Sequence, residues 1–153
     1  MKKFLIALGI FALMIIAFLG VSFVGQKGAE SNLPKKALLV GNQFIQVEIA
    51  GDPISRSRGL SGRSGLEEGA GMLFVFEASG LPQFWMKGML FPIDIVWVGD
   101  GKIVGVEKEA PPHYGFGDPE IYMAPKPVDM VLEIGAGEFD RLGLKIGDAV
   151  VIQ

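Results

Sequence analysis

Residues 93–108, IDIVWVGDGKIVGVEK, contain two apolar segments on either side of a Gly-Asp-Gly turn. Glycine and aspartate readily adopt the backbone of a tight hairpin turn, and the β-branched residues around them favour strands. The stretch therefore predicts a hairpin of two strands at 93–98 and 102–108. Both faces of the first strand are apolar, which is typical of a strand that is covered on both sides or lies in a barrel wall.

Short strand-like segments continue on both sides of this hairpin. Asp52-Pro53 predicts a helix start, with the aspartate as N-cap and the proline at the first helical position. We expect further strands at 37–40, 44–50, 71–76, 84–87, 130–134 and 149–153, and short helices at 55–60 and 138–142. No regular β-α-β alternation is visible, so the pattern predicts a mainly β domain. It would be a small antiparallel barrel or a jelly-roll-like sandwich with one or two short helices; a cradle-loop barrel is the alternative.

The N-terminal part of the chain has a different composition. Residues 4–25 include no charged side chain, and a helix of that length rises about 33 Å, enough to cross a hydrocarbon core of about 30 Å. Lys2 and Lys3 precede it and favour a cytoplasmic N-terminus at 1–3. We predict a transmembrane anchor at 4–25, a linker at 26–36 and a domain at 37–153 that is periplasmic or extracellular. A cleaved signal peptide stays open as the alternative, and it would export the domain as well.

Charge and residue types exclude several kinds of function. Apart from Lys2, Lys3 and Lys27, the chain has 11 basic and 17 acidic residues, so we expect no nucleic-acid partner. The absence of cysteine excludes a thiol nucleophile, and His113 is the single histidine, which excludes a multi-histidine zinc site. We expect no metal and no cofactor. The acidic residues at 118–129 lack the regular spacing of a calcium loop.

A few polar residues lie in apolar surroundings. Asp94 shares its strand face with apolar residues, and a lone buried carboxylate is costly unless it is hydrogen-bonded or paired with a cation. We predict a cluster of Asp94 with Arg58 or Lys87, beside Trp85. This cluster would be either a buried ion pair that fixes the register of the strands or the anchor of a ligand pocket. The candidate ligand-binding residues are Arg58, Arg63, Trp85, Lys87 and Asp94.

Several short segments occur here in one order: RGL at 58–60, GMLFVF at 71–76, FWMK at 84–87, PIDI at 92–95, VLEI at 131–134, AG at 136–137 and GLKIGD at 143–148. This order resembles the DUF192 family, also called UPF0127, over nearly all of 37–153. The resemblance implies a compact, mainly β domain with a helix that carries RGL, often behind a signal peptide or a membrane anchor. It implies no reaction. The five candidate ligand-binding residues match recurrent polar and aromatic positions of the family, whereas Gly88 replaces its usual asparagine.

Three functions remain open from the sequence. The first is a noncatalytic module that binds a small molecule or an envelope saccharide. The alternative is an envelope-acting hydrolase with Asp94 and Glu133 as acid and base, which would need the two carboxyl groups about 5–9.5 Å apart in an open cleft. The third is an interaction domain, which a large exposed apolar patch would favour.

Overall fold

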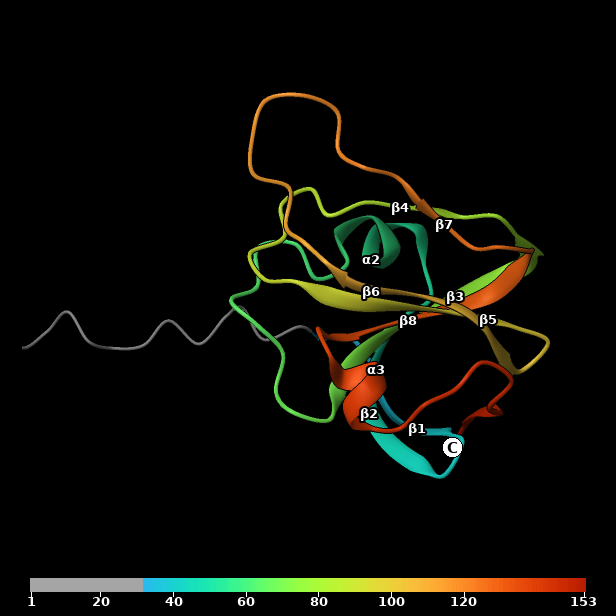
Figure 1. The fold of residues 1–153 in the computed structure, drawn as a ribbon. Coiled ribbons are helices and arrows are strands. Elements are labelled where there is room, and N and C mark those ends of the chain that lie inside the picture. The colour runs from blue at the N-terminus through green and yellow to red at the C-terminus, as the bar shows by residue number, and fades with distance from the viewer. Residues whose placement is uncertain (1–31) are drawn as a thin grey trace, which may run out of the picture. The chain divides into compact units, whose positions relative to one another are not determined.

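The computed structural model describes residues 32–153, and Figure 1 shows their fold. The predicted N-terminus 1–3, the anchor 4–25 and most of the linker 26–36 lie outside the described residues. The first strand, β1, begins at Lys35, inside the stretch that we assigned to the linker. Within residues 32–153, no helix is both long enough and apolar enough to cross a membrane.

The described chain is mainly β, as predicted, and its helices are short. Its elements are β1 Lys35–Val40, β2 Gln43–Ala50, α2 Pro53–Arg58, β3 Ala70–Gly80, β4 Gln83–Phe84, β5 Ile93–Gly99, β6 Lys102–Ala110, β7 Tyr122–Met123, β8 Val128–Gly135, α3 Glu138–Arg141 and β9 Val150–Ile152. The predicted hairpin at 93–108 is confirmed as β5 and β6, which turn at Asp100 and Gly101, both with positive φ.

One sheet holds seven strands in the order β6-β5-β8-β3-β2-β1-β9, and β4 pairs with β7 in a separate ribbon. All neighbouring pairs in the large sheet are antiparallel except β2 and β3, which run parallel. Our expectation of purely antiparallel pairing without a β-α-β unit is therefore wrong at this pair. The crossover helix is α2, and its six residues are too few to give a recognisable helical period in the sequence.

The large sheet curls into a half-barrel, which Figure 1 shows around β1, β2 and α3. Its two edges meet at one end, where Lys102 of β6 forms a bridge with Ala149, just before β9. The amide of Ile103 donates to the carbonyl of Asp148 at 3.0 Å, and the amide of Gly147 donates to the carbonyl of Ile103 at 2.8 Å. Closure at this end pairs backbone groups that an open edge would leave exposed.

A first hydrophobic cluster fills the concave side of this sheet. Its members come from all seven strands, and Phe139 of α3 joins them. Because both edge strands contribute, the sheet wraps around these side chains. They are Leu38, Val40, Ile45, Val47, Leu73, Val96, Val98, Ile103, Leu132, Ile134, Phe139, Leu144 and Val150.

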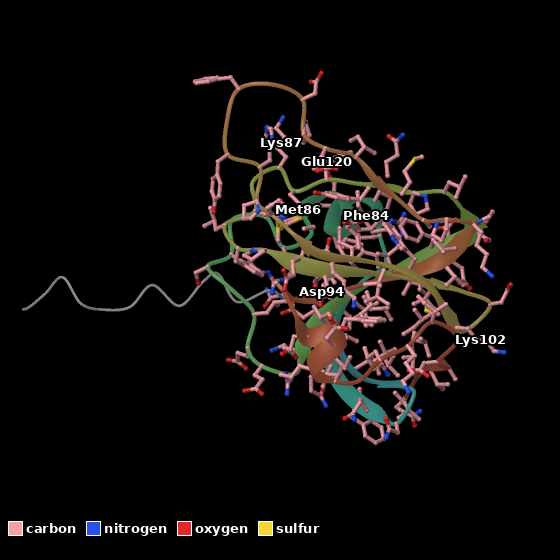
Figure 2. All side chains as sticks on the ribbon, viewed as in Figure 1. Phe84, Met86, Lys87, Asp94, Lys102 and Glu120 are labelled. Carbon is pink, nitrogen blue, oxygen red and sulfur yellow. The ribbon has the colours of Figure 1, made fainter. Side chains whose placement is uncertain are left out.

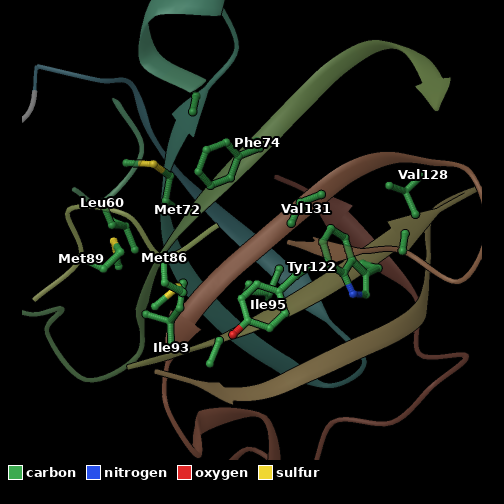
Figure 3. Close-up of a cluster of buried hydrophobic side chains, with 14 residues drawn as sticks. Leu60, Met72, Phe74, Met86, Met89, Ile93, Ile95, Tyr122, Val128 and Val131 are labelled. Carbon is green, nitrogen blue, oxygen red and sulfur yellow. The ribbon is translucent and has the colours of Figure 1, made fainter. Parts of the chain in front are cut away.

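A second cluster packs on the convex side of the central strands β3, β5 and β8 (Figure 3). It is covered by side chains from the turn after α2 and from the segments around β4 and β7, among them Leu60, Met86, Met89 and Tyr122. Every residue of β5 is buried, so the prediction that this strand is covered on both faces is confirmed. The convex cluster also forms the base of the candidate site.

The start of α2 agrees with the prediction and fixes one wall of that site. Asp52 is the N-cap, and its Oδ1 accepts hydrogen bonds from the amides of Ile54 at 2.9 Å and Ser55 at 3.0 Å. The hydroxyl oxygen of Ser55 accepts a hydrogen bond from the Asp52 amide at 3.2 Å, which completes a capping box. Pro53 opens the helix and Gly59 ends it, so Arg56 and Arg58 lie in its last turn.

Candidate functional site

A pocket of about 250 Å³ opens on the convex side of the sheet, between α2, β3 and the segment around β4. Its walls are aromatic and its rim carries two arginines. The lining residues are Arg56, Ser57, Arg58, Gly59, Leu60, Ser61, Phe74, Phe76, Pro82, Gln83, Phe84, Trp85, Met89 and Glu133. Among them, Glu133 is the one acidic side chain.

Glu133 comes from β8 and reaches the pocket from the sheet beneath it. The residue is 6% exposed, and its Oε2 is buried without a hydrogen-bond partner. Burial raises the pKa of the Glu133 carboxyl to about 8, although the positive charge of Arg63 acts in the opposite direction. The carboxyl group is therefore mostly neutral at pH 7 and can donate a hydrogen bond as well as accept one.

Arg63 lies next to this carboxyl group without lining the pocket. Its guanidinium makes a two-pronged pair with Glu48 of β2, with N–O distances of 2.9 Å and 2.7 Å. Glu48 and Glu133 are both in register with Met72 of β3, so the two carboxyl groups lie in one row across the sheet. The positive charge of Arg63 is largely neutralised by Glu48, which helps explain why Glu133 keeps a raised pKa.

Aromatic rings define the walls of the pocket. Phe84 packs edge-on against Phe74 at 5.0 Å between ring centroids and against Trp97 at 5.5 Å. Trp85 is 48% exposed, so part of its indole faces solvent at the rim. Edge-to-face contacts hold the two phenylalanines in place and leave Trp85 accessible to a ligand.

The two rim arginines differ in how they are held. Arg56 donates to the carbonyl oxygens of Gly51 at 2.6 Å and Val75 at 2.9 Å, and its guanidinium lies 5.2 Å from the ring centroid of Phe76. Arg58 is exposed, and within residues 32–153 its side chain is in no hydrogen bond or ion pair. Arg56 is thus part of the wall, whereas Arg58 is a cation at the mouth that a ligand can recruit.

Asp94 is buried on the opposite side of the sheet from this pocket, and the predicted cluster with Arg58 or Lys87 is wrong. Its oxygens accept hydrogen bonds from three backbone amides, those of Glu109 at 2.8 Å, Gly137 at 3.2 Å and Phe139 at 2.9 Å. Figure 2 shows Asp94 beside α3, away from Lys87. Backbone amides, which sequence patterns do not reveal, take the place of the expected cation.

The proposed catalytic pair of Asp94 and Glu133 is also wrong, because the two residues lie on opposite sides of the sheet. Asp94 pairs in register with Ile134 and Glu133 with Ile95, so the two carboxyl side chains leave the sheet on opposite faces. Ile134 belongs to the concave cluster and Ile95 to the convex one. No cleft can therefore present both groups to a single bond, and the two-carboxylate hydrolase is excluded.

The remaining candidate, Lys87, lies near the rim but does not line the pocket. Its carbonyl oxygen accepts a hydrogen bond from the hydroxyl of Ser61 at 3.1 Å, which ties the two rim segments together. Gly88 follows with φ of 76°, and its carbonyl accepts from the amide of Gly62 at 2.9 Å. Asparagine is the other residue that adopts such a backbone readily, so glycine here keeps the turn and removes only a polar side chain.

The loop between β6 and β7 contributes no ligand cluster. Glu120 accepts a hydrogen bond from the hydroxyl of Tyr122 at 3.0 Å, and the amide of His113 donates to the carbonyl of Met86 at 3.2 Å. In the part of the chain that the structure describes, no group of three or more histidine, aspartate or glutamate side chains could hold a metal ion.

The geometry thus defines a class: a mainly β domain whose curled sheet carries a small aromatic pocket over a buried carboxyl group. The chain belongs to the DUF192 family, described as "Uncharacterized ACR", whose model matches residues 37–152. Among curated proteins, none matches the chain.

Two solved structures are similar to this one. A putative transcription regulator from Sinorhizobium meliloti 1021 is 31% identical with a TM-score of 0.74, and the match covers 81% of this chain and 98% of that one. A protein of unknown function from Novosphingobium aromaticivorans is 30% identical with a TM-score of 0.75, and the match covers 80% and 89%. These matches establish the family and its fold.

Of the five candidate residues, the structure brings Arg58 and Trp85 together at the pocket. Arg63 lowers the pKa of Glu133 without lining the pocket, and Lys87 lies outside the pocket. Asp94 is on the other face of the sheet. Sequence reasoning missed the wall residues Arg56, Phe74 and Phe84. Strand alternation offered one signal: Glu133 shares its face with Val131 in VLEI, which marks it as a carboxyl group among apolar side chains.

Proposed function

We propose that the domain is a noncatalytic binding module that takes a small molecule or an envelope saccharide in the pocket beside Trp85. The observation that carries the proposal concerns Glu133, which lines an open pocket. Its carboxyl group is buried, and one of the carboxyl oxygens has no hydrogen-bond partner. An unsatisfied buried polar atom costs free energy, and a bound ligand with a matching polar group would relieve that cost. Apolar walls with a few convergent polar groups are typical of ligand sites.

The pocket volume limits what can bind. At about 250 Å³ it lies just below the usual range of ligand pockets, which begins at roughly 300 Å³. A single ring with short substituents fits this space, whereas a polymer would have to bind through one terminal unit. The exposed indole of Trp85 offers a flat surface on which a sugar or an aromatic ring can stack.

A thermal-shift screen of single-ring compounds on the full-length protein tests the proposal. A true ligand at about 100-fold its dissociation constant should stabilise the domain by about 2.7 kcal/mol. Trp85→Ala should remove this stabilisation, because Trp85 lines the pocket. Tyr114→Ala is the matched control, since it removes an exposed aromatic side chain outside the pocket. The proposal fails if no compound shifts the wild type, or if both variants lose the shift equally.

The proposal also places the domain outside the cytoplasm, held at the cell membrane by residues 4–25. Its support is the uncharged stretch behind Lys2 and Lys3, which is long enough to cross a bilayer. Full-length protein should stay in the membrane fraction after a high-salt wash, and protease added to intact spheroplasts should digest the domain. A protein that is protected from this protease, or that is recovered in the cytosol, would contradict the placement.

An interaction domain is the second candidate, and an exposed apolar surface favours it. The segments at 81–90 and 114–123 run together, because Phe84 pairs with Tyr122. Their exposed large apolar residues are Leu81, Trp85, Leu90, Tyr114, Phe116, Ile121 and Met123. The ligand screen separates the two candidates, because an interaction domain predicts that no small molecule depends on Trp85.

The Sinorhizobium protein is described as a putative transcription regulator. For this chain, acidic residues outnumber basic ones, which opposes binding to phosphates. We therefore retain a small molecule as the proposed ligand.

A further inference from the structure

We propose that the ligand of this pocket is a ring-bearing carboxylate, whose ring lies among Phe74, Phe84 and Trp85 and whose negative charge meets Arg58 at the mouth. This inference rests on the proposed binding function and adds the charge and the shape of the ligand. Three features of the pocket lead to it.

The first feature is the chemistry of the walls. Phe74 and Phe84 contact each other edge to face, so each presents part of its ring to the space between α2 and β4. Trp85 adds an indole at the rim, and Leu60 and Met89 are apolar neighbours deeper in the fold. These side chains suit a flat or gently puckered ring, which can stack on aromatic faces, better than a flexible chain or a bare inorganic anion.

The second feature is the charge at the mouth. Both charged residues of α2 that line the pocket are arginines. The two hydrogen bonds that the Arg56 guanidinium donates and its stacking on Phe76 leave Arg56 fixed in the wall. Arg58 has an exposed guanidinium, whose fork of N–H groups matches the two oxygens of a carboxylate. A carboxylate on the ligand is therefore favoured over a cation, which the two arginines would repel.

The third feature is the floor. Glu133 is the one acidic lining residue, and it is buried with an unpartnered oxygen. A protonated carboxyl group there can donate to, or accept from, a hydroxyl or carbonyl group on the far side of the ring. Because it carries no negative charge in that form, it does not repel an anionic ligand. The floor and the mouth thus specify a ring with a carboxylate at one end and a polar oxygen at the other.

This chemistry has two sources, aromatic hydroxy acids and sugar acids. Isothermal titration calorimetry on the full-length protein in a nonionic detergent distinguishes them with 4-hydroxybenzoate and glucuronate as probes. 4-Hydroxybenzamide and glucose are the matched uncharged probes, which keep the ring and lose the carboxylate. In the wild type, at least one carboxylate should bind about fivefold or more tightly than its uncharged counterpart, as expected for one charge-assisted contact.

Arg58→Gln should remove this preference while the uncharged probe still binds. Lys102→Gln is the control, because it removes one exposed positive charge that does not line the pocket and that Figure 2 shows away from Phe84, so it should leave the preference unchanged. If 4-hydroxybenzoate alone binds, the source is an aromatic acid; if glucuronate alone binds, it is a sugar acid.

Two results would overturn the inference, and they differ in what they leave standing. If the uncharged probes bind as tightly as the acids and Trp85→Ala still abolishes binding, the pocket is a ligand site but not one for an anion. The same conclusion holds if Arg58→Gln and Lys102→Gln weaken binding equally. If none of these ring compounds binds the wild type and the single-ring screen is also negative, the proposed binding function falls with the inference.

Discussion

Replacing Asp94 by alanine should lower the free energy of unfolding by about 3 kcal/mol or more. Asp94 is fully buried, and its two oxygens accept from the amides of Glu109, Gly137 and Phe139. Alanine leaves these three donors without their acceptor. Each buried unsatisfied donor costs about 1–3 kcal/mol, which sets the magnitude.

The position of these amides explains why one side chain matters so much. Glu109 has a positive φ of 53°, a strained backbone for a residue other than glycine, and it lies where the register between β5 and β6 shifts. Gly137 and Phe139 belong to the start of α3, which has no side-chain cap of its own. Asp94 therefore ties a bulge of β6 and the N-terminus of α3 to the central strand β5.

Urea denaturation of wild-type and variant proteins measures this effect. Asp148→Ala is a suitable control, because Asp148 accepts from a single exposed amide, that of Lys145, at 2.8 Å. Loss of such an exposed cap should cost about 1 kcal/mol. Asp94→Asn should lower the free energy of unfolding about as much as Asp94→Ala, because the side-chain NH2 group of asparagine is itself a donor and would face backbone N–H donors. Equal costs for Asp94→Ala and Asp148→Ala would show that the three buried contacts contribute little.

Asp94 also shows what the sequence can and cannot reveal. Strand alternation places it correctly on a buried face, and the cost of a buried carboxyl group correctly demands partners. The identity of the partners depends on where α3 and the bulge of β6 fold back, 15 to 45 residues further along the chain. The sequence shows where arginine and lysine side chains are available as partners. Nearly every residue carries the same backbone amide, so the sequence does not mark which amides will face Asp94.

The fold follows the same division between local and distant information. The hairpin of β5 and β6 and the capped start of α2 were predictable, because turn residues and capping residues act within a few positions. The parallel pairing of β2 with β3 was not, since it depends on how residues 51–69 cross over. The pocket likewise combines α2, β3, β4 and β8, so Arg58 and Glu133 meet only through tertiary structure.

The second large effect concerns the pH dependence of stability and the Glu133 side chain. Burial raises the pKa of Glu133 from 4.5 to about 8 in the folded domain. An acid with a raised pKa binds more protons in the folded state than in the unfolded state between these two values. The contribution of Glu133 to the free energy of unfolding is therefore fully present below pH 4.5. It decreases as the pH rises toward 8 and is lost above that value.

Glu133→Gln should remove this dependence, because glutamine resembles the neutral acid in shape and cannot ionise. Between about pH 5 and 8, the stability of the variant relative to wild type should increase by roughly 1.4 kcal/mol per pH unit, with an upper limit of about 5 kcal/mol. Several neighbouring charges reduce the effect without reversing it. Arg63, itself paired with Glu48, attracts the ionised form, and the rim residues Arg56 and Arg58 add positive charge.

Urea denaturation at a series of pH values compares wild type with Glu133→Gln and with Glu77→Gln, which removes an exposed carboxyl group from β3. The Glu77→Gln curve should run parallel to wild type, whereas the Glu133→Gln curve should separate from it progressively up to pH 8. Parallel curves for all three proteins would mean that Glu133 ionises as easily in the folded domain as in the unfolded chain. Its unpartnered oxygen would then be hydrated or paired, and the pocket would lose the neutral floor on which an anionic ligand depends.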